Sequence, residues 1–373
     1  MTDSTTIPPV RPFEGGRRRL QDPDPERAAL RAAGPLVRAE LPGGATAWVV
    51  TEEAAARRVL TDPRFSKDTA HAPHGIPGLE PPAAERPSLT TAEGAAHTRL
   101  RRAHAPLLSQ RALAGREERT AATARTLLTA LGPGEVDLMA DFTTRYPLTV
   151  VLDLVGAPPE LLDRTAEACR AMWSPDPAEH GRAFAELLRT SRAAVGRPGL
   201  ASELRDRLGD LDDDEIGYLV FGLVFAGQLT TDAALGSLLA TALERGLTGT
   251  SDADLDTLVH DVLRRHPPAP FTLWRFATEP VDLGGVRLPA GAPVLIDIRG
   301  TGTGEGGPGL SFGYGSHFCA GAHLARLELH AVLTVLRTSF PQARLAVRPG
   351  DLVEAYPPGP VGGRLTALPV VLR

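Results

Sequence analysis

Residues 312–321 read FGYGSHFCAG, the most specific pattern in this chain of 373 residues. The glycines on both sides of Cys319 allow the backbone to wrap closely around a flat ligand. A helical pattern over residues 320–338 follows at once, and the free N–H groups and the dipole at a helix start stabilise a thiolate. The run therefore predicts a cysteine thiolate that faces a flat ligand.

Two alternative interpretations use the same residues. A lone cysteine in a glycine-rich turn is commonly a buried core residue, and this run by itself leaves that possibility open. A phosphate-binding loop is a weaker alternative, because no Gly-Lys-Ser/Thr follows and no GxGxxG pattern opens a helix.

The run resembles the haem-binding loop of the cytochrome P450 family in spacing and order. This resemblance implies that Cys319 is the axial thiolate ligand of the iron of haem b. It also implies that Phe312, Gly313 and Gly321 belong to the haem-binding loop and that His317 contacts a haem propionate. The implied fold is the P450 fold, which is mainly α with small β-sheets.

Two further motifs occur in the order of the family. Residues 97–102, HTRLRR, resemble the helix that holds the haem propionates, which implies this role for His97 and Arg101. Residues 274–278, WRFAT, are similar to the strand whose arginine meets a propionate, here Arg275. Buried carboxylates need charge-assisted partners of this kind. Taken singly, each arginine is more often a solvated surface residue.

The longest apolar tract, residues 216–243, predicts a buried central helix. Within this tract, residues 226–231, AGQLTT, are similar to the oxygen-binding kink of the family. The similarity implies that Ala226 and Gly227 let the helix pass over the haem face and that Thr230 supplies the alcohol of the oxygen site. The alternative for Thr230 is a hydrogen bond to a carbonyl of its own helix.

Three departures from the family pattern stand out. Leu229 occupies the position of the usual acid before the threonine. Asp261 replaces the glutamate of the Glu-x-x-Arg pair, and we expect it to bridge to Arg264 at i, i+3. Residues 299–309 replace a longer meander whose arginine completes this ion-pair network, and Arg299 does not match that arginine in position.

Composition excludes several classes of protein. A net charge of −5 gives no electrostatic reason to expect nucleic-acid binding, and the charged Asp232 near the middle of the apolar tract argues against a membrane span. Cys169 and Cys319 are too far apart for a CxxC metal clip, so a reducing cytoplasm is the expected compartment. Lys67 is the only lysine in the chain.

The pattern along the chain predicts a flexible arm over residues 1–15 and a single haem-thiolate domain over residues 16–373. Residues 66–96 have no period, as expected of a functional loop. We expect helices over residues 52–61, 96–108, 112–131, 138–154, 159–173, 179–196, 216–243, 252–265 and 320–338, and strands over residues 45–51, 273–277, 281–288 and 293–298.

The expected function is that of a haem-thiolate oxidase or monooxygenase. It would hydroxylate or oxidatively couple a natural-product or peptide-like small molecule. Electrons would come from a ferredoxin or similar donor with its reductase, because the chain has no flavin or iron–sulfur motif. The alternative is a non-catalytic P450-like accessory protein that partners another biosynthetic enzyme.

Overall fold

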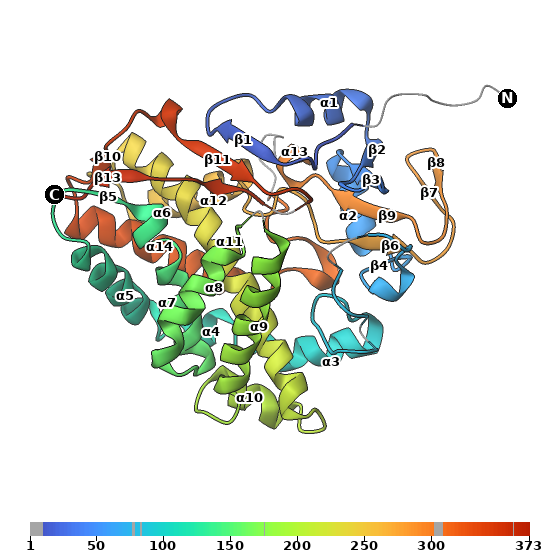
Figure 1. The fold of residues 1–373 in the computed structure, drawn as a ribbon, viewed down its shortest axis with the longest axis horizontal. Coiled ribbons are helices and arrows are strands. Elements are labelled where there is room, and N and C mark those ends of the chain that lie inside the picture. Colours follow the sequence, from blue (N-terminus) through green and yellow to red (C-terminus); the bar gives the residue numbers. More distant parts are fainter. Residues whose placement is uncertain (1–9, 77–78, 83, 175, 302–308, 361) are drawn as a thin grey trace.

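The computed structural model describes residues 10–373 apart from residues 77–78, 83, 175, 302–308 and 361. Most helices lie in the lower half of Figure 1, whereas β1 and β11 lie near its top, β2 to β4 and β6 to β9 on its right, and β5, β10 and β13 at its upper left. The helices are α1 (Pro25–Ala33), α2 (Glu53–Thr61), α3 (Gly94–His104), α4 (Gln110–Leu113), α5 (Glu117–Ala130), α6 (Leu138–Asp141), α7 (Arg145–Val155), α8 (Leu162–Ala171), α9 (Pro177–Ala194), α10 (Leu200–Arg207), α11 (Asp213–Arg245), α12 (Asp252–Arg265), α13 (Ile298–Thr301) and α14 (Ala322–Ser339). The strands are β1 (Gly16–Arg19), β2 (Leu36–Glu40), β3 (Thr46–Val50), β4 (Phe65–Ser66), β5 (Glu135–Asp137), β6 (Arg275–Ala277), β7 (Val281–Leu283), β8 (Val286–Leu288), β9 (Pro293–Ile296), β10 (Arg344–Leu345), β11 (Val353–Tyr356), β12 (Arg364–Leu365) and β13 (Pro369–Val371).

α11 is the central element of the helical part, where it packs against α7, α9, α12 and α14. A reciprocal cap fixes its start: Glu215 N donates to Asp212 Oδ1 at 2.8 Å, and Asp212 N donates to Glu215 Oε2 at 2.9 Å. Among the described helices, α11 alone is long and apolar enough to span a membrane, but 61% of its most apolar window is buried inside the protein. The predicted buried central helix is confirmed.

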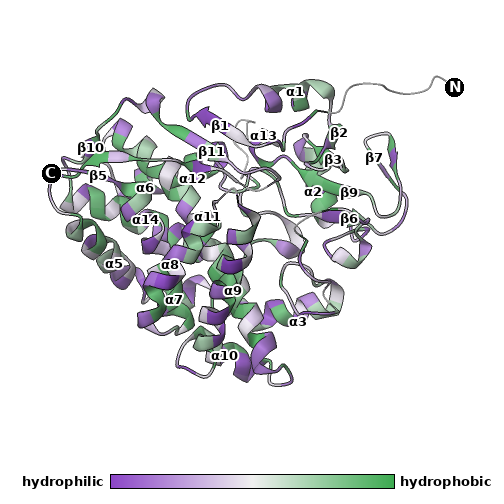
Figure 2. Ribbon diagram, in the orientation of Figure 1, coloured by the Kyte–Doolittle hydropathy of each residue, from purple (hydrophilic) through white to green (hydrophobic). Residues whose placement is uncertain are grey.

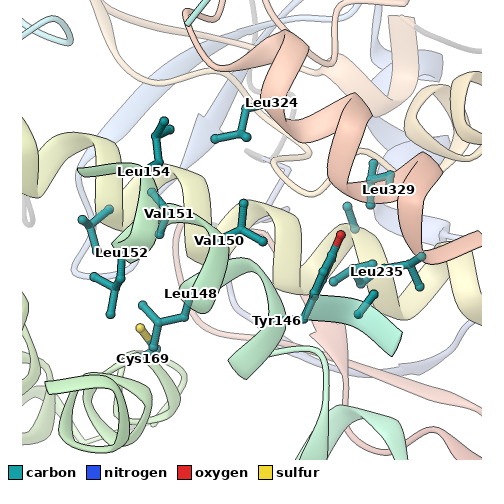
Figure 3. Packing of buried hydrophobic residues seen from close by; sticks show 14 of the residues in the cluster. Tyr146, Leu148, Val150, Val151, Leu152, Leu154, Cys169, Leu235, Leu324 and Leu329 are labelled. Atoms are coloured by element: carbon teal, nitrogen blue, oxygen red, sulfur yellow. The ribbon is translucent and has the colours of Figure 1, made fainter. Parts of the chain in front are cut away.

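The core lies where α7, α11 and α14 meet (Figure 3). Leu148 and Val151 of α7 are buried there with Leu235 of α11. The hydroxyl of Tyr146 donates to the backbone carbonyl of Glu328 at 2.9 Å, so its polar atom is satisfied inside the core. In Figure 2 the outer helices carry both apolar and polar residues, as expected when one helix face packs on a core.

The largest sheet has five strands in the order β2-β3-β9-β6-β4. β3 and β9 are parallel, and the other neighbours are antiparallel. The register between β4 and β6 pairs Phe65 with Ala277 and Ser66 with Phe276. This pairing brings the chain that follows Ser66 beside Arg275, the first residue of β6.

Most of the predicted elements are found. α12 agrees with its expected bounds, and β3, α2, α9 and α14 lie within two residues of theirs. The strand expected over residues 281–288 is instead the hairpin β7–β8, because Gly284 and Gly285 adopt positive φ and turn the chain. α1 and α10 have no counterpart among the expected helices.

The start of the chain is more ordered than predicted. Phe13 is 1% exposed and its ring centroid lies 4.9 Å from that of Phe271. Gly359 N donates to the carbonyl of Phe13 at 2.8 Å, and Val10 bridges to Ala39. The flexible arm expected over residues 1–15 is therefore wrong from Val10 onward, since burial of the phenylalanine ring offsets the entropy lost on ordering. Residues 1–9 lie outside the described residues.

Candidate active site

Cys319 lies in a tight loop directly before α14. Cys319 N donates to the carbonyl of Phe312 at 2.8 Å, which closes the loop around the cysteine. Gly313 and Gly315 both have positive φ, and a Cβ on Gly315 would lie 2.8 Å from the carbonyl of Leu60. The turn therefore favours glycine at both positions, and Gly315 also allows the close contact with the end of α2.

The thiol of Cys319 lies deep in the protein yet is exposed. Burial raises its pKa above the ordinary value. Four groups act in the opposite direction: the backbone N–H of Gly321 and the cationic side chains of Arg101, Arg326 and Lys67. A group that is both deep and exposed borders an internal space, and these neighbours would favour the thiolate there.

α11 carries an exposed stripe along one side of an otherwise buried middle section. Gly222, Ala226 and Thr230 are exposed at intervals of four residues, whereas every residue from Thr231 to Ala240 is buried. Thr230 Oγ1 donates to the carbonyl of Ala226 at 2.6 Å. Thr230 thus makes the hydrogen bond within its own helix that was the alternative to the oxygen-site role. Its side chain is nevertheless on the exposed side of α11.

The residues expected to hold propionates form one cluster. The rings of His97 and His317 lie 4.0 Å apart, and the buried Nε2 of His97 has no hydrogen-bond partner among the described residues. Arg275 is 5% exposed, and its Nη1 donates to the carbonyl of Phe65 at 3.0 Å. Arg101 is half-buried and makes no ion pair with the described residues. Burial lowers the pKa of His97 to about 4, so this ring is a neutral hydrogen-bonding group at pH 7.

Two charged residues of this cluster were not predicted. Glu93 precedes α3, and its Oε2 lies 3.2 Å from His317 Nε2 while its Oε1 accepts a hydrogen bond from Lys67 N at 2.6 Å. Burial and the charge of Arg275 together lower the pKa of Lys67 to about 8. The signal for Lys67 was present in the sequence as the single lysine among 40 basic residues.

These features fit a haem. Cationic side chains beside exposed Cys319 suit a flat dianion, and the unpartnered His97 Nε2 provides a hydrogen-bonding group for a carboxylate. The described residues contain no group of three or more His, Cys, Asp and Glu side chains that could hold a metal ion.

Comparisons with known proteins agree with the fold. No family model matches the chain. The chain is 39% identical over 414 positions to cytochrome P-450 monooxygenase DoxA of Streptomyces sp. (strain C5), with 98% of each chain covered. It is 32% identical to cytochrome P450 monooxygenase PikC of Streptomyces venezuelae, with 99% of this chain and 96% of that protein covered. The structure of CYP154C4 from Streptomyces sp. W2061 matches with a TM-score of 0.81 at 29% identity, covering 98% of both chains.

The fold and the full-length similarity together define the class of protein, an oxidising enzyme of a family that implies a haem-thiolate cofactor. The chain belongs to the cytochrome P450 family, as a monooxygenase of the bacterial type. The mainly helical P450 fold with small sheets is thereby confirmed. The alignment with DoxA has 414 positions for 373 residues, so it includes gaps in this chain.

The ion pair expected between Asp261 and Arg264 is not the one that forms. Asp261 Oδ2 lies 3.3 Å from Nη2 of Arg265, four residues along α12. Both partners are partly exposed, at 32% and 51% of their side-chain surface, because this side of α12 faces outward. The predicted bridge is corrected to an i, i+4 surface pair.

Arg299 does not replace the arginine of the meander in this network. Its guanidinium donates to Tyr356 Oη at 2.9 Å and lies 3.2 Å from His266 Nδ1. It therefore ties the end of α12 to β11. Most of the shortened segment, residues 302–308, lies outside the described residues.

Proposed function

We propose that this P450 monooxygenase binds haem b through Cys319 and uses it to hydroxylate or oxidatively couple a natural-product or peptide-like small molecule. The observation that carries the proposal is the deep, exposed thiol of Cys319 with the Gly321 N–H and three cationic side chains around it. When bound, a thiolate-ligated haem supplies the activation of dioxygen.

His97, Arg101, Arg275 and His317 would hold the two propionates. Their clustering across α3, β6 and the cysteine loop supports this role, because a buried carboxylate requires charge-assisted hydrogen bonds. Phe312, Gly313 and Gly321 would form the loop around the thiolate. The guanidinium of Arg326 covers the Phe312 ring at 4.7 Å, which keeps that ring beside Cys319.

Ala226, Gly227 and Thr230 would form the oxygen side of the site. The exposed small side chain of Ala226 leaves room beside α11, and the Thr230 hydroxyl can exchange its bond to the Ala226 carbonyl for an external partner. Leu229 can neither donate nor accept a proton. Thr230 with water, or a polar group of the substrate, would then hold the protons that dioxygen reduction consumes.

The substrate class is supported by relatives. Nocardicin C N-oxygenase of Nocardia uniformis subsp. tsuyamanensis is 30% identical over 88% of this chain, and a 2-hydroxy-5-methyl-1-naphthoate 7-hydroxylase of Streptomyces carzinostaticus is 27% identical over 88%. These names describe oxidations of small molecules of natural-product type. Electrons would come from a ferredoxin or a similar donor with its reductase. The compartment would be the cytoplasm, because both cysteines, Cys169 and Cys319, are free thiols.

The second candidate function is that of a non-catalytic accessory protein. Leu229 favours it, because the site lacks the usual acid. Cys319 and the exposed Thr230 oppose it, because an accessory protein needs neither a thiolate ligand nor an oxygen-site alcohol.

A visible spectrum tests the proposal. The reduced carbon monoxide complex of the purified protein should show the strongly red-shifted Soret band of thiolate ligation, and Cys319→Ala should abolish it while Cys169→Ala retains it. A band at the position of histidine-ligated haem would refute the ligation by Cys319. A thiolate band without substrate oxidation by any donor would favour the accessory function.

A further inference from the structure

Lys67 directly follows β4, and Arg275 is the first residue of the neighbouring strand β6. The antiparallel register of β4 with β6 pairs Ser66 with Phe276, and its continuation by one residue sets Lys67 opposite Arg275. Side chains directly opposite each other in an antiparallel pair lie on the same face, and like charges there repel. An anion between the two side chains would remove this repulsion.

Glu93 supplies only part of that negative charge. Its carboxylate accepts from Lys67 N and lies against His317, yet the Lys67 ammonium makes no hydrogen bond or ion pair with the described residues. The other nearby carboxylate, Glu80, accepts a hydrogen bond from Ser88 Oγ at 3.0 Å and bonds to Tyr218. Among the described residues, the ammonium of Lys67 thus has no direct hydrogen-bonded partner.

The charged side chains of the cluster leave a net positive charge. Arg101, Arg275 and Lys67 are cationic, and two carboxylates, Glu80 and Glu93, lie near Lys67. Three positive charges against two negative charges leave one, which favours an additional anion such as a haem propionate. Without Lys67 the cluster would carry no net charge.

We propose that Lys67 is an additional binding residue for a haem propionate, beside Arg275, and that it balances the charge of Glu93. The inference rests on the proposed haem binding.

The test measures haem loss from the holoenzyme to an excess of apomyoglobin. Lys67→Met should increase the rate of loss about tenfold or more, because one charge-assisted contact to a propionate disappears. Lys67→Arg keeps the charge and should stay within about threefold of the wild-type rate. The double variant Lys67→Met with Glu93→Gln restores the charge count and should recover most of the lost retention.

A modified haem identifies the carboxylate. With iron protoporphyrin IX dimethyl ester in place of haem b, the difference between wild type and Lys67→Met should vanish, because the propionates are esterified. A difference that persists would place the Lys67 contact elsewhere and overturn the proposal. The proposal would also be overturned if Lys67→Met left the rate of haem loss unchanged but weakened substrate binding. That result would assign the ammonium to a substrate anion.

The two levels of the argument fail separately. If wild-type protein shows no thiolate-ligated haem, the proposed function fails. If haem is bound but the double variant loses it as fast as Lys67→Met does, the charge pairing of Lys67 is refuted and the proposed function stands. Should Lys67→Met hold no haem at all, the double variant decides alone: recovery of haem supports the proposal, and no recovery overturns it.

Discussion

Nε2 of His317 lies 3.2 Å from Oε2 of Glu93, which joins the cysteine loop to the start of α3 across 224 residues of sequence. The same contact sets the His317 ring on the ring of His97, 4.0 Å away. Residues that were proposed separately as propionate contacts therefore share one cluster. The Glu93 carboxylate holds the His317 ring in this cluster and so orients it beside His97.

The first prediction concerns the two arginines of that cluster. Arg275→Ala and Arg101→Ala should both accelerate haem loss to apomyoglobin, because each leaves a partly buried carboxylate without its partner. The effect should be larger for Arg275, which is 5% exposed, than for the half-buried Arg101. The double variant should lose haem fastest. Arg102→Ala, on the exposed side of α3, serves as the control. Rates of haem loss that are equal in all four variants would disprove the assignment.

The second prediction concerns the protons of oxygen reduction. With surrogate ferredoxin and reductase we expect much of the NAD(P)H consumed to appear as hydrogen peroxide, because Leu229 cannot hold a proton or a water chain. Leu229→Glu should raise the yield of product per NAD(P)H above that of the wild type. Thr230→Ala should lower this yield below that of the wild type.

The control for that experiment is Leu229→Met, which changes shape without adding an acid. A high yield of product per NAD(P)H in the wild type, with a lower yield in Leu229→Glu, would show that a substrate group replaces the acid. In that case the expectation of leakage is wrong.

The third prediction compares two ion pairs that differ in burial. Asp261→Ala should lower the free energy of unfolding by about 0.5 kcal/mol, because the pair with Arg265 is partly exposed. This replaces the larger cost that a buried Asp261–Arg264 bridge would have implied. Asp297→Ala should cost about 3 kcal/mol, since Asp297 is fully buried and the buried Arg27 donates to it. Urea unfolding of both variants checks the order, and a larger loss for Asp261→Ala would contradict it.

The fourth prediction concerns stability at acidic pH. His104 is fully buried, its Nδ1 lies 2.8 Å from the carbonyl of Leu100, and burial lowers its pKa to about 4. Between pH 6.5 and 4 the unfolded chain binds a proton at this histidine and the folded protein does not. The stability from neutral His104 is therefore complete above pH 6.5 and is lost as the pH falls toward 4.

Urea unfolding across this range measures the loss. His104→Leu should have a flatter dependence of stability on pH than the wild type, with a difference of about 3 kcal/mol at pH 4. His74→Gln, at an exposed position, should leave the slope unchanged. Parallel curves for wild type and His104→Leu would show that this histidine does not contribute to the pH dependence.

The sequence alone was enough to predict the candidate site. The order and spacing of Cys319, its glycines and the helix after it are local properties, because a tight turn before a helix needs residues that permit positive φ. The central helix could also be predicted, since a long apolar tract that begins with an acidic cap is typical of a buried helix. The hairpin turn at Gly284 and Gly285, also local, was present in the sequence but was missed.

Only the tertiary structure decided which charges meet. Asp261 bonds to Arg265 and not to Arg264, because the outward orientation of α12 depends on packing that its own sequence does not show. Lys67 and Glu93 join the cluster through the register of β4 with β6 and through the start of α3, which are contacts between residues far apart in the chain. Periodicity reports which face of an element is buried, whereas ion pairing depends on the position of that face relative to every other element.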